Sequence, residues 1–141
     1  MFLTVAARAG LPSRSSSQSS APYIEGPVWE VQMIKAKYGL EDDYFKNLQA
    51  TLKNPLVEAK RQKVILDYKI FFGEAASRQD YNVMILLEFQ NMAAFDNLRQ
   101  RLDPILVKAA GSVGQQTQIQ IKRMDVREVL GEKVMREITL K

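Results

Sequence analysis

The residues that could carry chemistry are charged side chains set among apolar ones in strand-like segments. They are Glu30, Asp67, Lys69, Glu88 and Glu137. A carboxylate enclosed in a cavity has a raised pKa and can act as a general acid or base. Alternatively, the same groups are ion pairs or rim residues at a subunit interface, with Lys69 beside an acid, and this is the interpretation we favour. The uncharged residues expected to line the same cavity are Gln32, Asn82, Met84 and Leu86.

Tyr38 and Tyr44 are further candidates for ligand contact, because they flank the turn between a predicted strand and a predicted helix. The chain has no histidine and no cysteine, which removes the commonest general base, the usual haem ligand and all thiolate chemistry. No dense Asp/Asn/Gly spacing typical of a calcium loop occurs. We therefore expect no metal and no cofactor, and we cannot assign a catalytic residue.

The charge pattern argues against nucleic acid as a partner. The formal net charge is +4, but Arg8 and Arg14 supply two of the positive charges before any acidic residue appears. In the rest of the chain basic residues are dispersed among acids, as in Glu58-Ala59-Lys60-Arg61, which is typical of a solvated surface. No apolar run approaches the length needed to span a bilayer, so we expect no membrane partner.

Residues 1–22, MFLTVAARAGLPSRSSSQSSAP, differ in composition from the remainder. The segment is interpreted as a disordered leader without a role, as the remnant of an export signal, or as an organellar transit peptide. Its fate sets the expected location: cytoplasmic if it is retained, exported or organellar if it is a targeting segment. Residues 23–141 form one predicted domain of the size that can bury a core.

Periodicity predicts the elements that must position the candidate residues. Strands are expected over VWEVQMIKA (28–36), VILDYKIFF (64–72), YNVMILLEF (81–89) and KVMREITLK (133–141). A helical stripe runs from Phe45 to Ala59, with a break expected near Asn54 because of Pro55. Asn91 is expected to cap a second helix, which Asp103-Pro104 restarts or bends. For residues 115–130 both helix and strand fit, and we favour a helix ended by Gly131.

This order predicts an α+β, ferredoxin-like βαββαβ fold, a four-stranded antiparallel sheet with its helices on one face. Trp29, Val31 and Met33 are predicted under the helices, together with alternate residues of the later strands. The opposite face is too apolar for water, so we expect a second copy to cover it, giving a homodimeric barrel. The residues expected at that interface are Ile34, Ile65, Phe71, Met84, Leu86 and Met135.

The string DYNVMILLEFQNMAAFDNL (80–98) resembles the dimeric α/β-barrel superfamily, which includes stress-responsive A/B barrel, EthD-like, NIPSNAP-like and antibiotic-biosynthesis monooxygenase proteins. The closing REVLGEKVMREITLK (127–141) is similar to the end of small bacterial members without an assigned function. The resemblance covers roughly residues 28–141 and implies architecture, not activity. Haem-binding members use a histidine, which this chain lacks, and members that oxidise without a cofactor use Asn, Tyr or Trp in the cavity.

Three functional hypotheses follow. The first is a cofactor-free module that binds a small hydrophobic ligand or acts as an accessory protein. The second is a cofactor-independent monooxygenase or isomerase that acts on a small hydrophobic or aromatic compound. The third is a purely structural dimer whose barrel is filled by side chains. Cavity volume discriminates between them.

Overall fold

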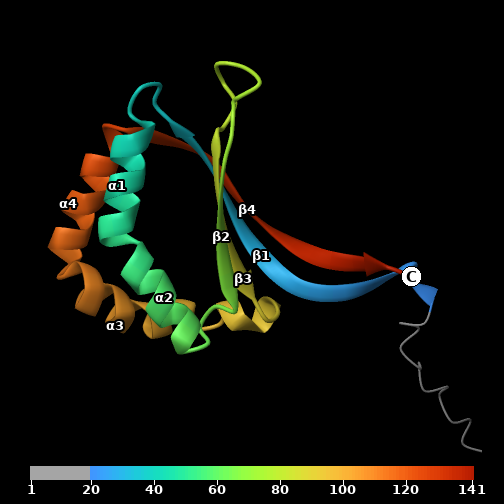
Figure 1. Cartoon of the computed structure of the whole chain (residues 1–141). Helices are drawn as coiled ribbons and strands as arrows, with labels where there is room; N and C mark the ends of the chain where they lie inside the picture. Colours follow the sequence, from blue (N-terminus) through green and yellow to red (C-terminus); the bar gives the residue numbers. More distant parts are fainter. Residues whose placement is uncertain (1–19) are drawn as a thin grey trace, which may run out of the picture.

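The computed structural model describes residues 20–141, so most of the predicted leader lies outside the described residues. Four strands, four α-helices and one short 3-10 helix follow one another along this part of the chain (Figure 1). In order, they are β1 (Tyr23–Ala36), α1 (Glu41–Thr51), α2 (Lys53–Arg61), β2 (Asp67–Phe72), β3 (Val83–Phe89), η2 (Met92–Phe95), α3 (Leu98–Ala110), α4 (Val113–Met124) and β4 (Arg127–Leu140). No helix of the described residues is long and apolar enough to cross a membrane.

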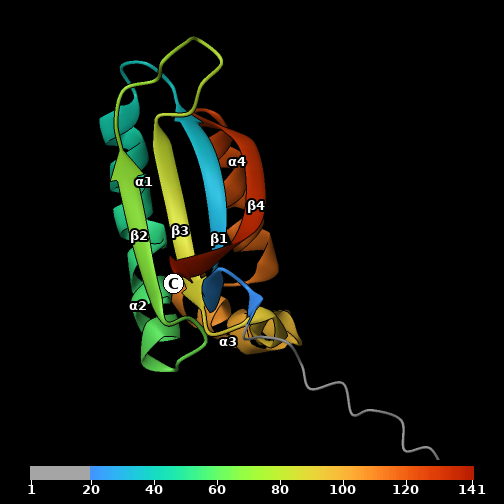
Figure 2. The same cartoon turned by 90° about the vertical axis from the view of Figure 1, so that its right-hand side faces the viewer.

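The four strands form one antiparallel sheet in the order β2-β3-β1-β4, and the helices cover one of its faces (Figures 1 and 2). This strand order and the one-sided helical layer are those of the ferredoxin-like fold, which confirms the predicted fold class. We call the uncovered side of the sheet the open face. Figure 2 looks onto that face, with the helices behind it.

The core between sheet and helices has two clusters of buried side chains. One joins β1 and β3 to α1 through Ile34, Tyr44, Leu48 and Ile85. The other surrounds Phe89 and is built from α2, α3 and the segment before β2. Burial of these apolar side chains is the main term that holds the helices against the sheet.

The predicted orientation of β1 is wrong. Val28 and Ile34 are buried under the helices and pair with Phe89 and Val83, so Glu30 and Gln32 also face the helices. Trp29, Val31 and Met33 therefore lie on the open face. The prediction failed because both faces of β1 are apolar, so that alternation alone does not identify the covered one.

Ile65 is a second correction. It was predicted on the open face, but it is buried in the core cluster around Phe89. The strand begins only at Asp67, and residues before it form a turn that passes through Lys63 with a φ of 59°. Without strand geometry, Val64 and Ile65 are not forced onto opposite faces, and both pack inward.

Local signals placed several boundaries correctly and others not. Asn91 caps as predicted, since its side chain accepts from the backbone N–H of Ala94, but the helix it starts is only the short η2. The first helix breaks at Leu52, close to the expected position near Asn54, and Pro55 is accommodated in the first turn of α2. Pro104 lies within α3 without ending it.

The ambiguous segment 115–130 contains both structures. Its first part belongs to α4, which starts at a capping box formed by Ser112 and Gln115, and the strand β4 begins at Arg127. The predicted helix end at Gly131 is wrong. Gly131 lies inside β4, opposite Met33 and next to a register shift between β1 and β4.

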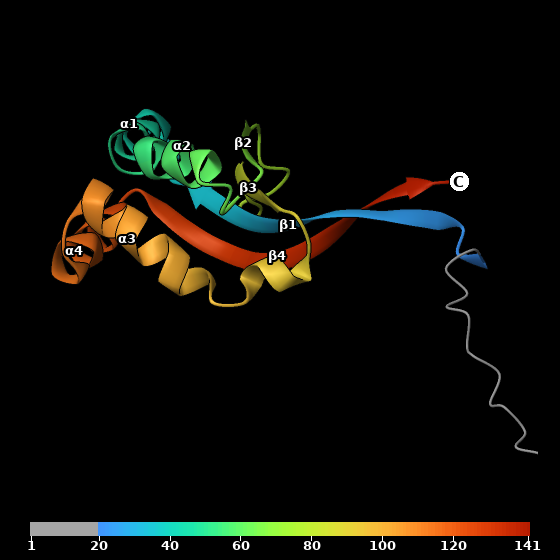
Figure 3. The same cartoon turned by 90° about the horizontal axis from the view of Figure 1, so that it is seen from below.

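Beyond the end of β3, strands β1 and β4 continue as a two-stranded arm, which we define as residues 23–27 with residues 137–140. β3 pairs with β1 only from Val28 onward, whereas Tyr23 pairs with Leu140. The arm projects away from the helices (Figures 1 and 3). Ile24 and Leu140 are exposed on it, so apolar side chains extend along a ribbon that the other described residues, 28–136, do not cover.

Candidate functional site

A cavity of about 330 Å³, which we call the inner cavity, lies between the sheet and the helices. Its apolar wall consists of Leu48, Leu52, Leu56, Ile85, Leu87 and Val129. Its polar side chains are Glu30, Gln32, Tyr44, Gln120, Arg123, Arg127 and Glu132. An apolar space with a few converging polar groups is the usual form of a small-molecule site.

Two carboxyl groups meet in this cavity. Glu30 is opposite Val134 and Gln32 is opposite Glu132, so Glu30 and Glu132 are diagonal neighbours on the helix-covered side of adjacent strands. The pKa of Glu30 is raised from 4.5 to about 7, mainly by burial and then by a side-chain hydrogen bond with Glu132 and by the charge of Glu132. Glu30 therefore exchanges a proton near neutral pH, as an acid–base catalyst must.

Two arginines enter the cavity from the junction between α4 and β4. Arg123 is only 7% exposed, and its guanidinium donates from Nε to Oδ1 of Asn47 over 2.8 Å and from Nη2 to Oγ1 of Thr51. Burial lowers the pKa of Arg123, and the charge of Arg127 lowers it further. Both arginines thus place positive charge where water is scarce.

Arg127 is held more loosely. Its Nη2 donates to Oε1 of Gln120 at 3.0 Å, and its guanidinium carbon lies 6.0 Å from the centre of the Tyr44 ring. Its Nε is buried and has no hydrogen-bond partner. The buried Tyr44 hydroxyl has a raised pKa because of burial, although the charges of Arg127 and Arg123 oppose the shift.

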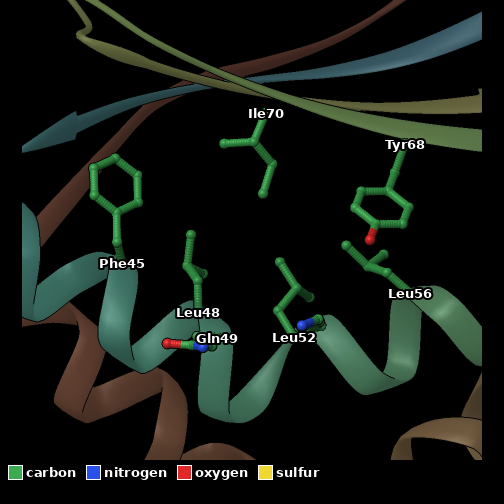
Figure 4. Close-up of a pocket in the computed structure, with 8 residues that line it drawn as sticks. Phe45, Leu48, Gln49, Leu52, Leu56, Tyr68 and Ile70 are labelled. Atoms are coloured by element: carbon green, nitrogen blue, oxygen red, sulfur yellow. The ribbon is translucent and has the colours of Figure 1, made fainter.

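A second cavity, of about 260 Å³, adjoins the inner one at the β2 edge (Figure 4). Leu48, Leu52 and Leu56 point from α1 and α2 toward the sheet and line both spaces. Tyr68 and Ile70 point from β2 toward these leucines. Phe45 closes one end of the cavity, and its ring packs edge-on against that of Phe72, with the ring centroids 4.9 Å apart. This edge cavity is almost wholly apolar.

The open face has a separate, shallow hollow of about 360 Å³. Trp29 donates from Nε1 to Oε2 of Glu137 at 2.9 Å, and the ammonium of Lys69 lies 5.2 Å from the centre of the Trp29 ring. The apolar side chains around them include Phe71, Leu86 and Met135. Phe71 is 55% exposed and Met135 is 51% exposed.

The residues predicted to line one cavity therefore lie in three places: the inner cavity, the open face and the far end of the sheet. Glu30 and Gln32 line the inner cavity, whereas Lys69, Met84, Leu86 and Glu88 follow the register of the open face and do not join them. Asp67 accepts a hydrogen bond from Lys60 of α2, with 3.0 Å between Nζ and Oδ1, and thus forms an ion pair. Burial, then the charges of Asp67 and Glu137, raise the pKa of Glu88.

Tyr38 and Asn82 lie near the far end of the sheet. Tyr38 is fully exposed. Asn82 accepts from the backbone N–H of Ala36 at 2.8 Å and donates to its carbonyl at 3.2 Å, so it continues the β1–β3 pairing with its side chain. Both border a wide depression beside the β2–β3 loop.

The sequence patterns missed four polar residues of the inner cavity, Gln120, Arg123, Arg127 and Glu132, whereas Tyr44 was a candidate for ligand contact and does line it. Arg123 and Arg127 have helical spacing, but the chain changes from helix to strand between them, and no local pattern places both in one cavity. Among the described residues no group of three or more acidic side chains could hold a metal ion.

The fold and the inner cavity together define a ferredoxin-like α+β protein. Among solved structures, the chain is similar to HapK from Hahella chejuensis, with 11% identity over 78% of this chain and 91% of that one, and a TM-score of 0.46. It is also similar to a NIPSNAP family protein of unknown function from Agrobacterium tumefaciens, with 15% identity, 82% and 90% coverage and a TM-score of 0.48.

A third similar structure is described as a dimeric ferredoxin-like protein from an uncultured marine organism, with 9% identity, 84% and 90% coverage and a TM-score of 0.47. The identities and TM-scores of these proteins are too low to carry an argument about activity, so the fold assignment rests on the strand order. No family model and no curated protein sequence matches the chain.

Proposed function

We propose that this protein binds a small, mainly hydrophobic molecule in the inner cavity, without a cofactor, and acts as a homodimer. The observation that carries the proposal is the pair of adjoining cavities that share Leu48, Leu52 and Leu56. Water against these leucines makes few hydrogen bonds, so an apolar group that displaces it gains free energy.

Exposed apolar surface supports the homodimer. Phe71 and Met135 lie on the open face, and the arm of β1 and β4 projects on the same side, away from the helices (Figure 3). A second copy packed against the open face would cover Phe71, Met84, Leu86 and Met135. The arm of each copy would then extend along the other copy. A self-complementary two-fold interface is the commonest way to bury such a face.

The test of ligand binding is a titration with 1-octanol and toluene, two neutral apolar probes, observed through the methyl resonances of the leucines. We expect shifts confined to Leu48, Leu52, Leu56 and Leu87, the leucines that line the cavities. Leu52→Phe fills the space shared by both cavities and should abolish these shifts, whereas Leu66→Phe, at an exposed site outside both cavities, should preserve them. Binding of the probes at other sites only would refute the proposal.

A second function, proton transfer in an isomerase, is favoured by the Glu30–Glu132 pair. Glu30 has a pKa near neutrality and lies in an enclosed space, so it can remove a proton next to a carbonyl and return it elsewhere. The test is exchange of the protons beside the carbonyl of 2-octanone in D₂O. Wild type should accelerate the exchange and Glu30→Gln should not, while equal rates with and without protein would exclude this activity for that class of ketone.

A further inference from the structure

The two arginines of the inner cavity are not paired with its carboxyl groups. Arg123 and Arg127 form no ion pair with a carboxylate among residues 20–141. The partners of Arg123 are the neutral side chains of Asn47 and Thr51, and the partner of Arg127 is the neutral Gln120. A charge in a partly buried site is costly unless it is paired, so the absence of a counterion is informative.

The two arginines differ in what they can offer to a ligand. Nε and Nη2 of Arg123 already donate hydrogen bonds to Asn47 and Thr51 of α1, which hold the side chain in place. Arg127 uses Nη2 once, and its Nε is buried and unpartnered. The guanidinium of Arg127 therefore makes fewer hydrogen bonds than that of Arg123, and a ligand carboxylate could accept from the donors of Arg127 that remain.

We infer that the ligand of the inner cavity is a monocarboxylate with an apolar body, whose carboxylate binds Arg127 and whose body lies against Leu48, Leu52 and Leu56. This inference rests on the proposed function and names its ligand class. A single free guanidinium edge matches the two oxygens of one carboxylate. The acidic Glu30 and Glu132 on another wall disfavour a dianion such as a phosphate ester.

The test compares octanoate with octanamide, which has the same chain length and shape but no charge, by calorimetry at neutral pH. Wild type should bind octanoate about tenfold or more tightly than octanamide, because a charge-assisted hydrogen bond is stronger than a neutral one. Arg127→Met should remove that preference and leave octanamide binding unchanged. Arg127→Lys keeps the positive charge but lacks the paired N–H donors of a guanidinium, so it should bind octanoate with intermediate affinity.

Arg99→Met is the matched control, since Arg99 is exposed on α3 and pairs only with Asp103. It should leave the octanoate preference intact. If octanamide binds as tightly as octanoate, or if inorganic phosphate competes better than octanoate, the carboxylate assignment fails and the apolar binding site stands. If octanoate, octanamide and 1-octanol all fail to bind, the proposed function fails and the inference fails with it.

Discussion

Arg123 donates from Nε to Oδ1 of Asn47 at 2.8 Å, and this bond joins α4 to α1 across 76 positions of the sequence. The same guanidinium also donates to Thr51, one turn further along α1. Few other contacts connect these two helices. The Arg123–Asn47 hydrogen bond thus fixes α4 relative to α1 at the wall of the inner cavity.

Loss of the Arg123–Asn47 hydrogen bond should destabilise the protein. Asn47→Ala leaves a buried guanidinium short of one acceptor, which we expect to cost about 1–3 kcal/mol in the free energy of unfolding. Arg123→Met should cost a similar amount, and the double variant less than the sum of the two. Urea unfolding of all three variants measures the coupling, and strictly additive effects would show that the hydrogen bond does not stabilise the fold.

Glu30 should make stability depend on pH. Its pKa is about 7 in the folded chain and near the ordinary 4.5 when unfolded, so between these values the folded state binds more protons. Stability therefore falls as pH rises from about 4.5 to 7, by about 1–2 kcal/mol after allowance for partial exposure. Glu30→Gln should remove this fall. Urea unfolding at pH 5 and pH 8 tests it, with the exposed Glu128→Gln as control.

Phe71→Asp should break the homodimer. A charge on the apolar open face would be desolvated on association, so we expect the dissociation constant to rise about 100-fold or more. Light scattering and sedimentation measure it. Val57→Asp, an equally exposed apolar position on α2, should leave assembly unchanged. A wild-type chain that remains a monomer near 16.1 kDa would contradict the proposed dimer directly.

Asn82→Ala should affect stability and not ligand binding. The side chain makes two hydrogen bonds to the backbone of Ala36, and their loss should cost about 1–3 kcal/mol. Octanol binding in the inner cavity should persist, because Asn82 does not line it. Asn54→Ala, exposed on α2, is the control. A binding defect without a loss of stability would instead give Asn82 the ligand role that the sequence first suggested.

The strands and helices were predictable because their signals are local. Alternation over residues 81–89 and the leucine spacing of α1 and α2 both persist for several periods. The covered face of β1 was not predictable in the same way. Val28 and Ile34 on one side and Val31 and Met33 on the other are all apolar, and only pairing with β3, a non-local contact, distinguishes them.

The candidate site was predictable in part. Glu30 and Gln32 stood out as polar residues in an apolar strand, and they do line a cavity, although one on the opposite side of the sheet. Arg123 and Arg127 could not be singled out, since a basic residue on a helix end is usually solvated. Their burial depends on α4 crossing to α1 and on β4 returning along β1, which no window of the sequence encodes.

The pairing of β1 with β4 has a kinetic consequence. β1 lies in the interior of the sheet, and it pairs on one side with β3 and on the other with β4, whose partners are about 100 positions away along the chain, as in Glu25 with Ile138. Contacts of such long range form slowly, because a large loop must close first. Until β4 docks, β1 has a bare hydrogen-bonding edge that other chains can occupy, so refolding should compete with aggregation in proportion to protein concentration.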